Sequence, residues 1–580
     1  MVRFRGLIAV AVIGALCAAA AATTATGRSE QESASTSTLM PGVTYTREVD
    51  FTSRGPIVLD IVTAPKPAGP LYSLAPALSN DSLRGKEELT RLASRVGGGA
   101  ATVGIDGDYF DRGSGAPHGI LMQDGVLESG PATGRSSLGI SADGTLTIAR
   151  VALAGTWQGN GQRRSLVLNT PAGKGRFTLY TPVYGTATPS ESGVVEAVIA
   201  KLPPAQPGVS LDGAVTQVTA AGPTRIPSGG AVLVARGSQS TAQLRAEAPV
   251  GQQVAALLSL SPDWSGLASA IGGGPLLVRN GKPVFHANES FDPRRLNTRQ
   301  PRGAIGQLAD GRIVLVAVEG TSPAYSVGMS SYELAVELSR LGATTAVGLD
   351  AGPAAGIEFD GKLLTRPSGG TEAKLSDALV LTYSGVYAAP PSAPVLSPNG
   401  DGVGDTETLS YQLARPSNVV ATLSGPSGTT IPLANEAEPP GVHTFTWDGM
   451  NAGAPAPEGQ WTFDVTATED RSVTTTAQQA FSLDDTLSSL AVTGGSRPTA
   501  TFQLTRPADV VVRIERPTGI PVATVSSGSR AAGAQHATWR GKIGKRRAPG
   551  GWYRLEVVAT SSVGTSSLAA LFSFRPHAGQ

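Results

Sequence analysis

The sequence predicts an α+β domain, built on a mixed sheet with few helices, followed by two all-β sandwich domains. The 580-residue chain holds 72 glycines and 42 prolines but only 5% aromatic residues, a composition typical of many short strands and turns. Residues 301–383 alternate apolar strand patterns with one helical pattern. Residues 396–580 contain a unit of about 90 residues twice, as an internal repeat of short strands would produce.

Residues 1–27 predict a secretory signal peptide, in which two arginines precede an apolar run that ends in small residues. A membrane anchor is the alternative, but the apolar run is short. Cys17, the single cysteine, lies inside this segment, and Leu16 before it disfavours lipoprotein attachment. We therefore expect the mature chain to be secreted or associated with the cell surface, and to contain no disulfide.

Composition and motifs exclude several classes of function. The formal net charge is +1, so the sequence predicts neither a nucleic-acid partner nor an anionic membrane partner. After residue 27 no long apolar run predicts a membrane span. The sequence holds no H-x-x-x-H pair, G-x-S-x-G elbow or P-loop. It therefore predicts no required cofactor.

Composition shifts divide the chain into six segments. Residues 388–395 are proline-rich and predict a linker. In chain order, the predicted segments are a signal peptide (1–27), a disordered spacer (28–40), the α+β domain (41–387), the linker (388–395) and two β-sandwiches (396–483 and 484–580).

The first half of the α+β domain reads as strands with one short helix. Residues 44–51 and 57–62 are predicted strands, and residues 86–96 form an amphipathic helical pattern. Short strands separated by turns follow between residues 138 and 255. Asn280-Gly281 predicts the tip of a hairpin.

The second half centres on a buried strand and a capped helix. Residues 313–318 are a continuous apolar run, as in a strand covered on both faces. Ser330 and Glu333 have capping-box spacing before a helical apolar stripe. Residues 346–349 then form a short strand that ends at Asp350. An acid at such a strand end either faces a cleft or caps a turn.

The chemistry of the domain depends on acids and arginines near glycine-rich loops. Carboxylates in a cleft can protonate a leaving oxygen or activate water, and arginine binds phosphate oxygens through paired hydrogen bonds. Each candidate has a structural alternative, as a turn residue or an ion-pair partner. The candidate acids are Asp106, Asp108, Glu319, Asp350 and Glu372, and the candidate arginines are Arg135 and Arg302.

A calcium site is a further candidate, at the start of the first sandwich. Asn399, Asp401 and Asp405 supply oxygen ligands in a glycine-rich loop, which suits Ca²⁺. An array of turns without metal is the alternative, because the loop lacks the distal glutamate of an EF-hand.

Residues 103–381 resemble the phosphodiester glycosidase family. The resemblance lies in GIDGDYF (104–110), PHGILMQDG (117–125), Arg135 before SSLGIS, GGGPLLVRNGK (272–282), PRGAIG (301–306), SVGMSSYELAVELSRLGA (326–343), LDAG (349–352) and RPSGG (366–370). It implies hydrolysis of a sugar-1-phosphodiester in a glycan or cell-wall polymer. LSPNGDGVGDT and the repeats after it resemble the Ig-like modules of flagellar hook-capping proteins.

The resemblance also implies roles for particular residues. Asp350 is the leading acid or base, with Glu319, Glu372, Asp106 and Asp108 as further acids. Arg302 and Arg135 are expected to hold the phosphate. Further substrate contacts are expected from His118, Gly273, Gly274, Ser368 and Lys374.

The loop after Asp350 departs from the family pattern. The family has glycines followed by two hydroxyl residues, whereas this chain has Gly352, Pro353, Ala354 and Ala355. Proline also removes a backbone N–H that could bind a phosphate oxygen. The alternative prediction is therefore a catalytically impaired member that acts as a glycan-binding or scaffold protein of the cell surface.

Overall fold

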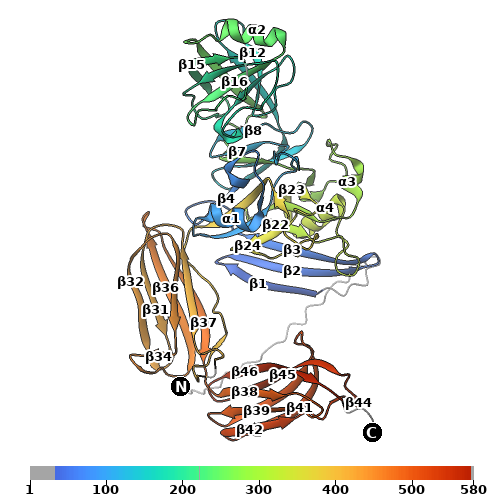
Figure 1. Ribbon diagram of the computed structural model, residues 1–580, viewed down its shortest axis with the longest axis vertical. Helices are drawn as coiled ribbons and strands as arrows, with labels where there is room; N and C mark the ends of the chain where they lie inside the picture. The colour runs from blue at the N-terminus through green and yellow to red at the C-terminus, as the bar shows by residue number, and fades with distance from the viewer. Residues whose placement is uncertain (1–32, 221, 401, 577–580) are drawn as a thin grey trace, which may run out of the picture.

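The computed structural model describes residues 33–220, 222–400 and 402–576 (Figure 1). The predicted signal peptide lies outside this part of the chain. No helix within the described residues is long and apolar enough to cross a membrane. The α+β domain comes first, and two β-sandwiches follow it, as the sequence predicts.

The α+β domain is built on an eight-stranded sheet, here called the large sheet, in which every neighbouring pair is antiparallel. The predicted strand β22 lies near its centre, and alternate side chains of β22 enter two separate cores, one on each face. Its continuous apolar sequence follows from this double burial. In spatial order the strands are β1 (Ser33–Met40), β2 (Val43–Thr52), β3 (Gly55–Ala64), β22 (Ile313–Val318), β21 (Arg302–Leu308), β23 (Ala343–Ala351), β19 (Leu276–Arg279) and β20 (Lys282–Pro283).

A five-stranded small sheet packs against one face of the large sheet and shares a hydrophobic core with it. Helix α4 (Ser331–Arg340) covers the other face of the large sheet, and α1 (Leu89–Gly97) covers the outer face of the small sheet. The domain thus has four layers, helix, sheet, sheet and helix. The strands of the small sheet are β25 (Lys362–Leu363), β24 (Ile357–Phe359), β6 (Ala101–Asp106), β27 (Asp377–Tyr383) and β4 (Tyr72–Leu78).

The predicted capping box of α4 is confirmed. The Ser330 hydroxyl accepts from the Glu333 amide at 3.3 Å, and the Ser330 amide donates to the Glu333 carboxylate at 2.9 Å. These two bonds satisfy backbone donors that have no partner inside the helix. They fix the start of α4 just after the loop that follows β22.

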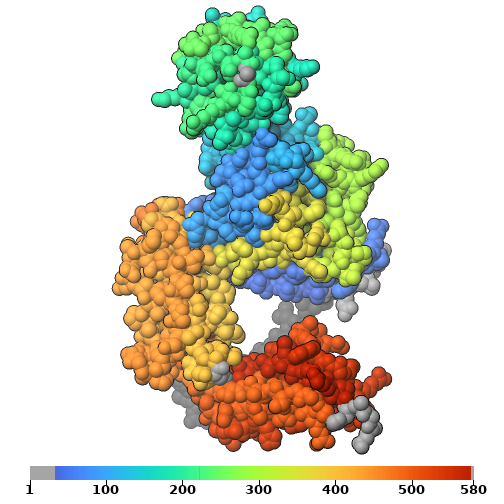
Figure 2. All heavy atoms as spheres, viewed as in Figure 1, coloured from blue at the N-terminus to red at the C-terminus, as the bar shows by residue number. Residues whose placement is uncertain are grey.

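Most of the short strands predicted between residues 138 and 255, from Ala152 onward, belong to a closed seven-stranded barrel, which Figure 2 shows as a separate lobe. Its strands are β11 (Ala152–Gln158), β12 (Arg164–Leu168), β13 (Phe177–Tyr180), β16 (Ala231–Arg236), β14 (Val194–Ile199), β15 (Ser210–Thr219) and β17 (Gln253–Ser261). Helix α2 (Ser238–Glu247) contacts β14 and β16. Among the described residues of this domain, β12 and β13 are the strand pair that runs parallel.

A bridging sheet of five strands connects the barrel to the four layers. Its strands are β10 (Leu146–Arg150), β9 (Ser136–Ile140), β18 (Ser269–Gly272), β7 (Leu121–Gln123) and β8 (Val126–Ser129). Strands β7 and β18 both contact β4 of the small sheet. The loop between β6 and β7 therefore lies where the barrel lobe meets the four layers.

Both C-terminal domains are two-sheet sandwiches, and equivalent tryptophans, Trp447 and Trp539, are buried in their two cores. The strands of the first are β28 (Tyr387–Ala388), β30 (Glu407–Leu413) and β33 (Gly441–Trp447), facing β29 (Val395–Leu396), β37 (Thr474–Leu483), β36 (Gly459–Glu469), β31 (Ser417–Ser424) and β32 (Thr430–Glu438). Those of the second are β38 (Leu487–Thr493), β39 (Thr499–Leu504) and β42 (Gly533–Thr538), facing β41 (Pro521–Arg530), β40 (Ala508–Glu515), β45 (Gly551–Thr560) and β46 (Thr565–Phe574).

The structure corrects two predicted segments. Residues 33–40 of the predicted disordered spacer form strand β1, which pairs with β2 along its length. Alternating serine and threonine supplied the β-propensity, and the pairing uses the edge of the large sheet. The predicted linker also begins too early, because Tyr387 and Ala388 form β28 of the first sandwich and pair with β30.

Candidate active site

Asp350 borders a pocket, which is one of the two alternatives that its position at a strand end leaves open. Its backbone N–H donates to the carbonyl of Gly107 at 2.8 Å, which holds the end of β23 against the loop after β6. Its carboxylate accepts from the Ala351 amide at 2.7 Å. The pocket has a volume of about 250 Å³ and is lined by Lys86, Phe110, Arg112, Asp350, Pro353, Ala354, Ala373 and Lys374.

Three more aspartates are buried in the same region of the fold. Asp106 accepts from the Gly356 amide at 3.0 Å, and its other oxygen has no hydrogen-bond partner among the described residues. Asp108 accepts from the Gly119 amide at 2.5 Å. Asp377 accepts from the Asp108 amide at 2.7 Å. The loop after β6 and the start of β27 are therefore tied together by their acids.

Glycines make room for these carboxylates. A Cβ at Gly107 would lie 2.0 Å from Oδ1 of Asp377, and one at Gly272 would lie 2.3 Å from Oδ2 of Asp108. A Cβ at Gly303 would likewise lie 2.3 Å from Oδ2 of Asp106. Any larger residue at these positions would displace an acid of the cluster.

Burial sets the protonation of the acids. It raises the pKa of Asp350 to about 6, although the Ala351 amide and nearby arginines oppose the rise. Burial raises the pKa of Asp106 well above its ordinary value, and the charge of Asp350 adds to the effect. Burial and the charge of Asp377 raise the pKa of Asp108, and burial raises the pKa of Asp377 to about 7. Asp350 is therefore poised to exchange a proton near neutral pH.

Two arginines, Arg135 and Arg295, lie against the ring of Tyr109, the residue that follows Asp108. The guanidinium of Arg135 lies 5.2 Å from the ring centre of Tyr109, and that of Arg295 lies 5.1 Å from the same ring. Arg135 also lies 4.3 Å from the ring of Phe291. One terminal nitrogen of Arg135 is buried and has no hydrogen-bond partner among the described residues. Nε of Arg135 donates to the Ser290 carbonyl at 3.4 Å, and a second guanidinium nitrogen without an acceptor is suited to an anionic ligand.

Arg302 donates hydrogen bonds to backbone carbonyls, whereas the sequence predicts that it contacts the phosphate. Its guanidinium donates to the Met329 carbonyl at 2.7 Å and to the carbonyls of Arg295, Leu296 and Thr298 at 2.7, 3.2 and 3.0 Å. The last three belong to the end of helix α3 (Pro293–Asn297). Arg302 therefore fixes the helix that carries Arg295.

Two predicted acids lie in separate clusters. Glu319 pairs with Arg47 at 3.1 Å and accepts from the Arg366 amide at 2.8 Å. Glu372 accepts from both the amide and the hydroxyl of Thr90, at 2.9 and 2.8 Å, in the first turn of α1. Glu372 thus acts as a helix cap contributed by a distant part of the chain.

Some of the remaining predicted substrate contacts lie at the pocket, and others support the backbone around it. Lys374 lines the pocket, and His118 lies on the loop after β6, where partial burial and the charge of Arg135 lower its pKa. Gly274 donates its amide to the Gly348 carbonyl at 2.8 Å, and Gly273 packs closely on that carbonyl. These glycines therefore hold β23 in place. Ser368 is half-buried in the turn after β25.

The predicted calcium loop is described in part, because Asp401 lies outside the described residues. Asp405 accepts from the amides of Gly400 and Gly402, both at 2.8 Å, as in a turn. Asn399 donates to the Ser397 hydroxyl at 3.0 Å. In the described part of the chain, no group of three or more His, Cys, Asp or Glu side chains could hold a metal ion. Calcium at this loop stays a prediction.

Sequence reasoning missed Asp377, Arg112 and Arg295. Asp377 precedes an apolar strand and resembles an ordinary strand boundary in the sequence. Arg295 belongs to a short helix that has no amphipathic pattern. A cue was available for Arg112, which closely follows the quoted GIDGDYF motif.

Two family models match parts of the chain. Residues 206–382 match the model of the phosphodiester glycosidase family, and residues 400–471 and 485–562 match that of the FlgD Ig-like domain. The SPbeta prophage-derived uncharacterized protein YomE of Bacillus subtilis (strain 168) is 32% identical over 107 residues. That match covers 18% of this chain and 16% of the relative, so the chain spans about one sixth of the relative's length.

Two solved structures resemble the chain. A hypothetical protein from Synechocystis is 26% identical with a TM-score of 0.51, and the match covers 59% of this chain and 62% of that one. A protein from Burkholderia pseudomallei is 20% identical with a TM-score of 0.51, over 61% of this chain and 97% of that one, which shows the fold alone. The chain thus has a region that matches the phosphodiester glycosidase family, followed by two regions that match the FlgD Ig-like domain, in agreement with the resemblance found in the sequence.

Proposed function

We propose that the protein hydrolyses sugar-1-phosphodiesters, with Asp350 as the acid or base. The observation that carries the proposal is an acid with a pKa of about 6 at a pocket lined by Arg112, where the charges of Arg112, Arg135 and Arg295 oppose the rise in that pKa. Arginines of this kind bind the charged diester, and the acid assists the oxygen that leaves or the water that attacks. Family membership at the domain level supports the same reaction class.

The arrangement predicts different roles for Asp350 and for the buried acids. Asp350 faces the pocket, whereas Asp106, Asp108 and Asp377 are fully buried and have raised pKa values. Raised pKa values favour the protonated forms of these three acids, which limits the negative charge beside an anionic substrate. Arg135 is the leading phosphate ligand because its buried nitrogen has no acceptor in the described part of the chain.

The test is the release of free sugar from N-acetylglucosamine-1-phosphodiesters and related sugar phosphodiesters. Asp350→Asn should lower kcat by about 10²–10⁴-fold, the range for loss of a general acid or base. Arg135→Gln should raise KM by about tenfold or more. The matched control is Arg91→Gln, whose side chain is exposed on α1 and pairs with Glu88 at 3.6 Å. No turnover across the panel would refute the proposal.

The loop after Asp350 favours a second candidate function. Pro353 and Ala354 line the pocket where the family pattern has glycine and hydroxyl residues. A domain that binds a glycan phosphodiester without cleaving it is therefore the alternative. Calorimetry with the same panel distinguishes the two, because binding at micromolar concentration without product favours the scaffold function.

We also propose that the protein acts outside the cell, as the predicted signal sequence of residues 1–27 suggests. Ig-like domains are compatible with that location. Mass spectrometry of the N-terminus of protein collected from culture medium would test it. Intact protein retained in the cell would contradict the proposal.

A further inference from the structure

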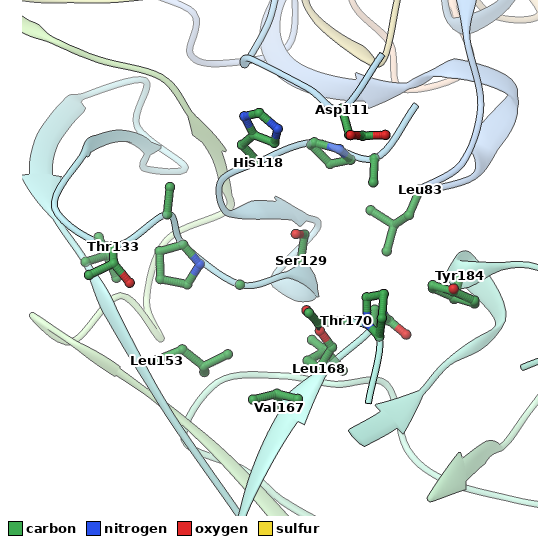
Figure 3. Close-up of a pocket in the computed structure, with 18 of the residues that line it drawn as sticks. Leu83, Asp111, His118, Ser129, Thr133, Leu153, Val167, Leu168, Thr170 and Tyr184 are labelled. Atoms are coloured by element: carbon green, nitrogen blue, oxygen red, sulfur yellow. The ribbon is translucent and has the colours of Figure 1, made fainter. Parts of the chain in front are cut away.

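A second, larger pocket lies where the barrel lobe meets the four layers. Its volume is about 880 Å³, within the range of ligand sites. Figure 3 shows His118 and Asp111 on one side, and Leu153, Val167 and Leu168 on the opposite side. The first two belong to the loop after β6, and the other three belong to barrel strands β11 and β12. Two parts of the fold therefore build this pocket together.

The barrel side of the pocket wall is mostly aliphatic, whereas the other sides also contain polar residues, namely Arg84, Asp111, Ser114, His118, Ser129, Thr133 and Arg150. Leu83, Leu153 and Val167 face the pocket, together with prolines, alanines and glycines of the surrounding loops, and Tyr184 is its aromatic ring. Sugar hydroxyls need hydrogen-bond partners when they leave water, so the aliphatic barrel side does not suit a second sugar. An aliphatic chain loses no hydrogen bond there and gains from burial.

The polar groups of the barrel side already have partners. The Asn169 side chain donates to the Glu128 carbonyl and the Thr181 hydroxyl, and accepts from the Thr181 amide, each at 2.8 Å. The Thr170 hydroxyl donates to the Leu168 carbonyl at 2.9 Å. These groups hold the protein together at the pocket and are not available to orient a sugar.

One loop forms a wall of both pockets. Phe110 and Arg112 line the pocket of Asp350, whereas Asp111 and His118 line the larger one. The His118 amide donates to the Tyr109 carbonyl at 2.8 Å. This bond fixes the rim to the backbone of Tyr109, whose ring contacts Arg135 and Arg295. On the other rim, Gly134 lines the larger pocket and directly precedes Arg135. The loop that carries Arg112 therefore borders both pockets, and the residue before Arg135 borders the larger one.

We propose that the larger pocket holds an aliphatic chain, and that the substrate is a sugar-1-phosphate esterified to a lipid-like alcohol. This inference rests on the proposed function. In the reaction, the bond between C1 of the sugar and the phosphate oxygen breaks and the oxygen of water joins C1. The water proton goes to the phosphate, and the products are free sugar and an alkyl phosphate. The chain stays in the larger pocket throughout.

The experiment compares three diesters of N-acetylglucosamine-1-phosphate, with methyl, octyl and mannosyl groups, on the full chain. Each methylene that enters the pocket should lower KM by up to about fourfold. We expect KM for the octyl ester to be about a hundredfold below that for the methyl ester. Val167→Glu should reduce this ratio to under about tenfold, and Leu153→Gln tests the same wall without added charge. The control is Val250→Glu, which is 63% exposed on a barrel loop and should keep the full ratio.

Octyl phosphate, measured by calorimetry, separates this inference from the proposed function. If no diester is cleaved but octyl phosphate binds the wild type and binds Val167→Glu at least tenfold more weakly, the pocket assignment stands and the hydrolase proposal fails. If the methyl ester is cleaved and the octyl ester is no better, the pocket assignment fails and the hydrolase proposal stands. A lower KM for the mannosyl ester than for the octyl ester also overturns the pocket assignment. Equal octyl phosphate affinity in the wild type and both pocket variants overturns it as well.

Discussion

Replacing Asp350 by asparagine should stabilise the protein at pH 8 although it removes the proposed catalytic acid. At that pH the folded chain holds an ionised carboxylate whose pKa is about 6, against an ordinary value of 3.8. A rise of about two pKa units corresponds to about 3 kcal/mol. The side chain borders a pocket and is partly exposed, so we reduce this figure to about 2 kcal/mol. Asparagine removes the cost and keeps an oxygen that can accept from the Ala351 amide.

The sign of the effect follows from which state binds the proton more tightly. The folded protein has the higher pKa, so ionisation favours the unfolded chain from about pH 4 upward, and the cost is complete above pH 6. At pH 4.5 the advantage of Asp350→Asn should fall below about 1 kcal/mol. In thermal unfolding, we expect a Tm increase of about 4 °C at pH 8 and a much smaller one at pH 4.5.

The matched control is Asp143→Asn. Asp143 is exposed, and its hydrogen bonds to Lys66 and Thr145 lower its pKa to about 2, so its replacement should not stabilise the protein at pH 8. An Asp350→Asn protein with an equal or lower Tm at pH 8 would refute the reasoning. A gain of the same size at both pH values would refute it too, because the gain would then have no link to ionisation.

Three further variants test the structural assignments. Arg302→Met should lower the unfolding free energy by about 3 kcal/mol, because four carbonyls lose a charged donor; a normal Tm with a raised KM would favour direct phosphate binding instead. Glu372→Ala should cost about 1 kcal/mol in thermal unfolding and leave kcat within about twofold, whereas a large fall in kcat at unchanged Tm would contradict its role as the cap of α1. Gly107→Ala should cost about 3 kcal/mol or more in denaturant unfolding, because its Cβ would lie 2.0 Å from the Asp377 carboxylate; a stable variant would show that the acid cluster can move.

Local patterns predicted much of the fold. The strand at 313–318 and the capping box at Ser330 depend on residues close together in sequence, and the structure has both. Each of these features follows from periodicity or from a cap, which a single sequence displays directly. Closure of the barrel was not predictable in this way, because it depends on pairing between strands far apart in the chain.

The roles of the site residues were harder to predict than the positions of the elements. Glu372 and its partner Thr90 are 282 residues apart, and no local pattern joins them. Arg302 follows a proline in a family motif and looks like a ligand, but its donors meet the carbonyls of a helix just before it. Asp377 looks like a strand boundary until β27 is placed beside β6. Sequence gives the type of each side chain, whereas its role depends on which distant backbone atoms surround it.

The junction at Tyr387 determines where this protein can be divided. Tyr387 is buried in the core of the glycosidase domain, its ring lies 5.7 Å from that of Phe359, and its backbone forms the first strand of the first Ig-like domain. Gln412 of that Ig-like domain also donates to both carboxylate oxygens of Asp360, at 3.0 and 2.9 Å. A fragment that stops at Tyr387 would expose an aromatic face and remove a strand from its neighbour. The smallest transplantable unit is therefore the glycosidase domain together with its first Ig-like domain.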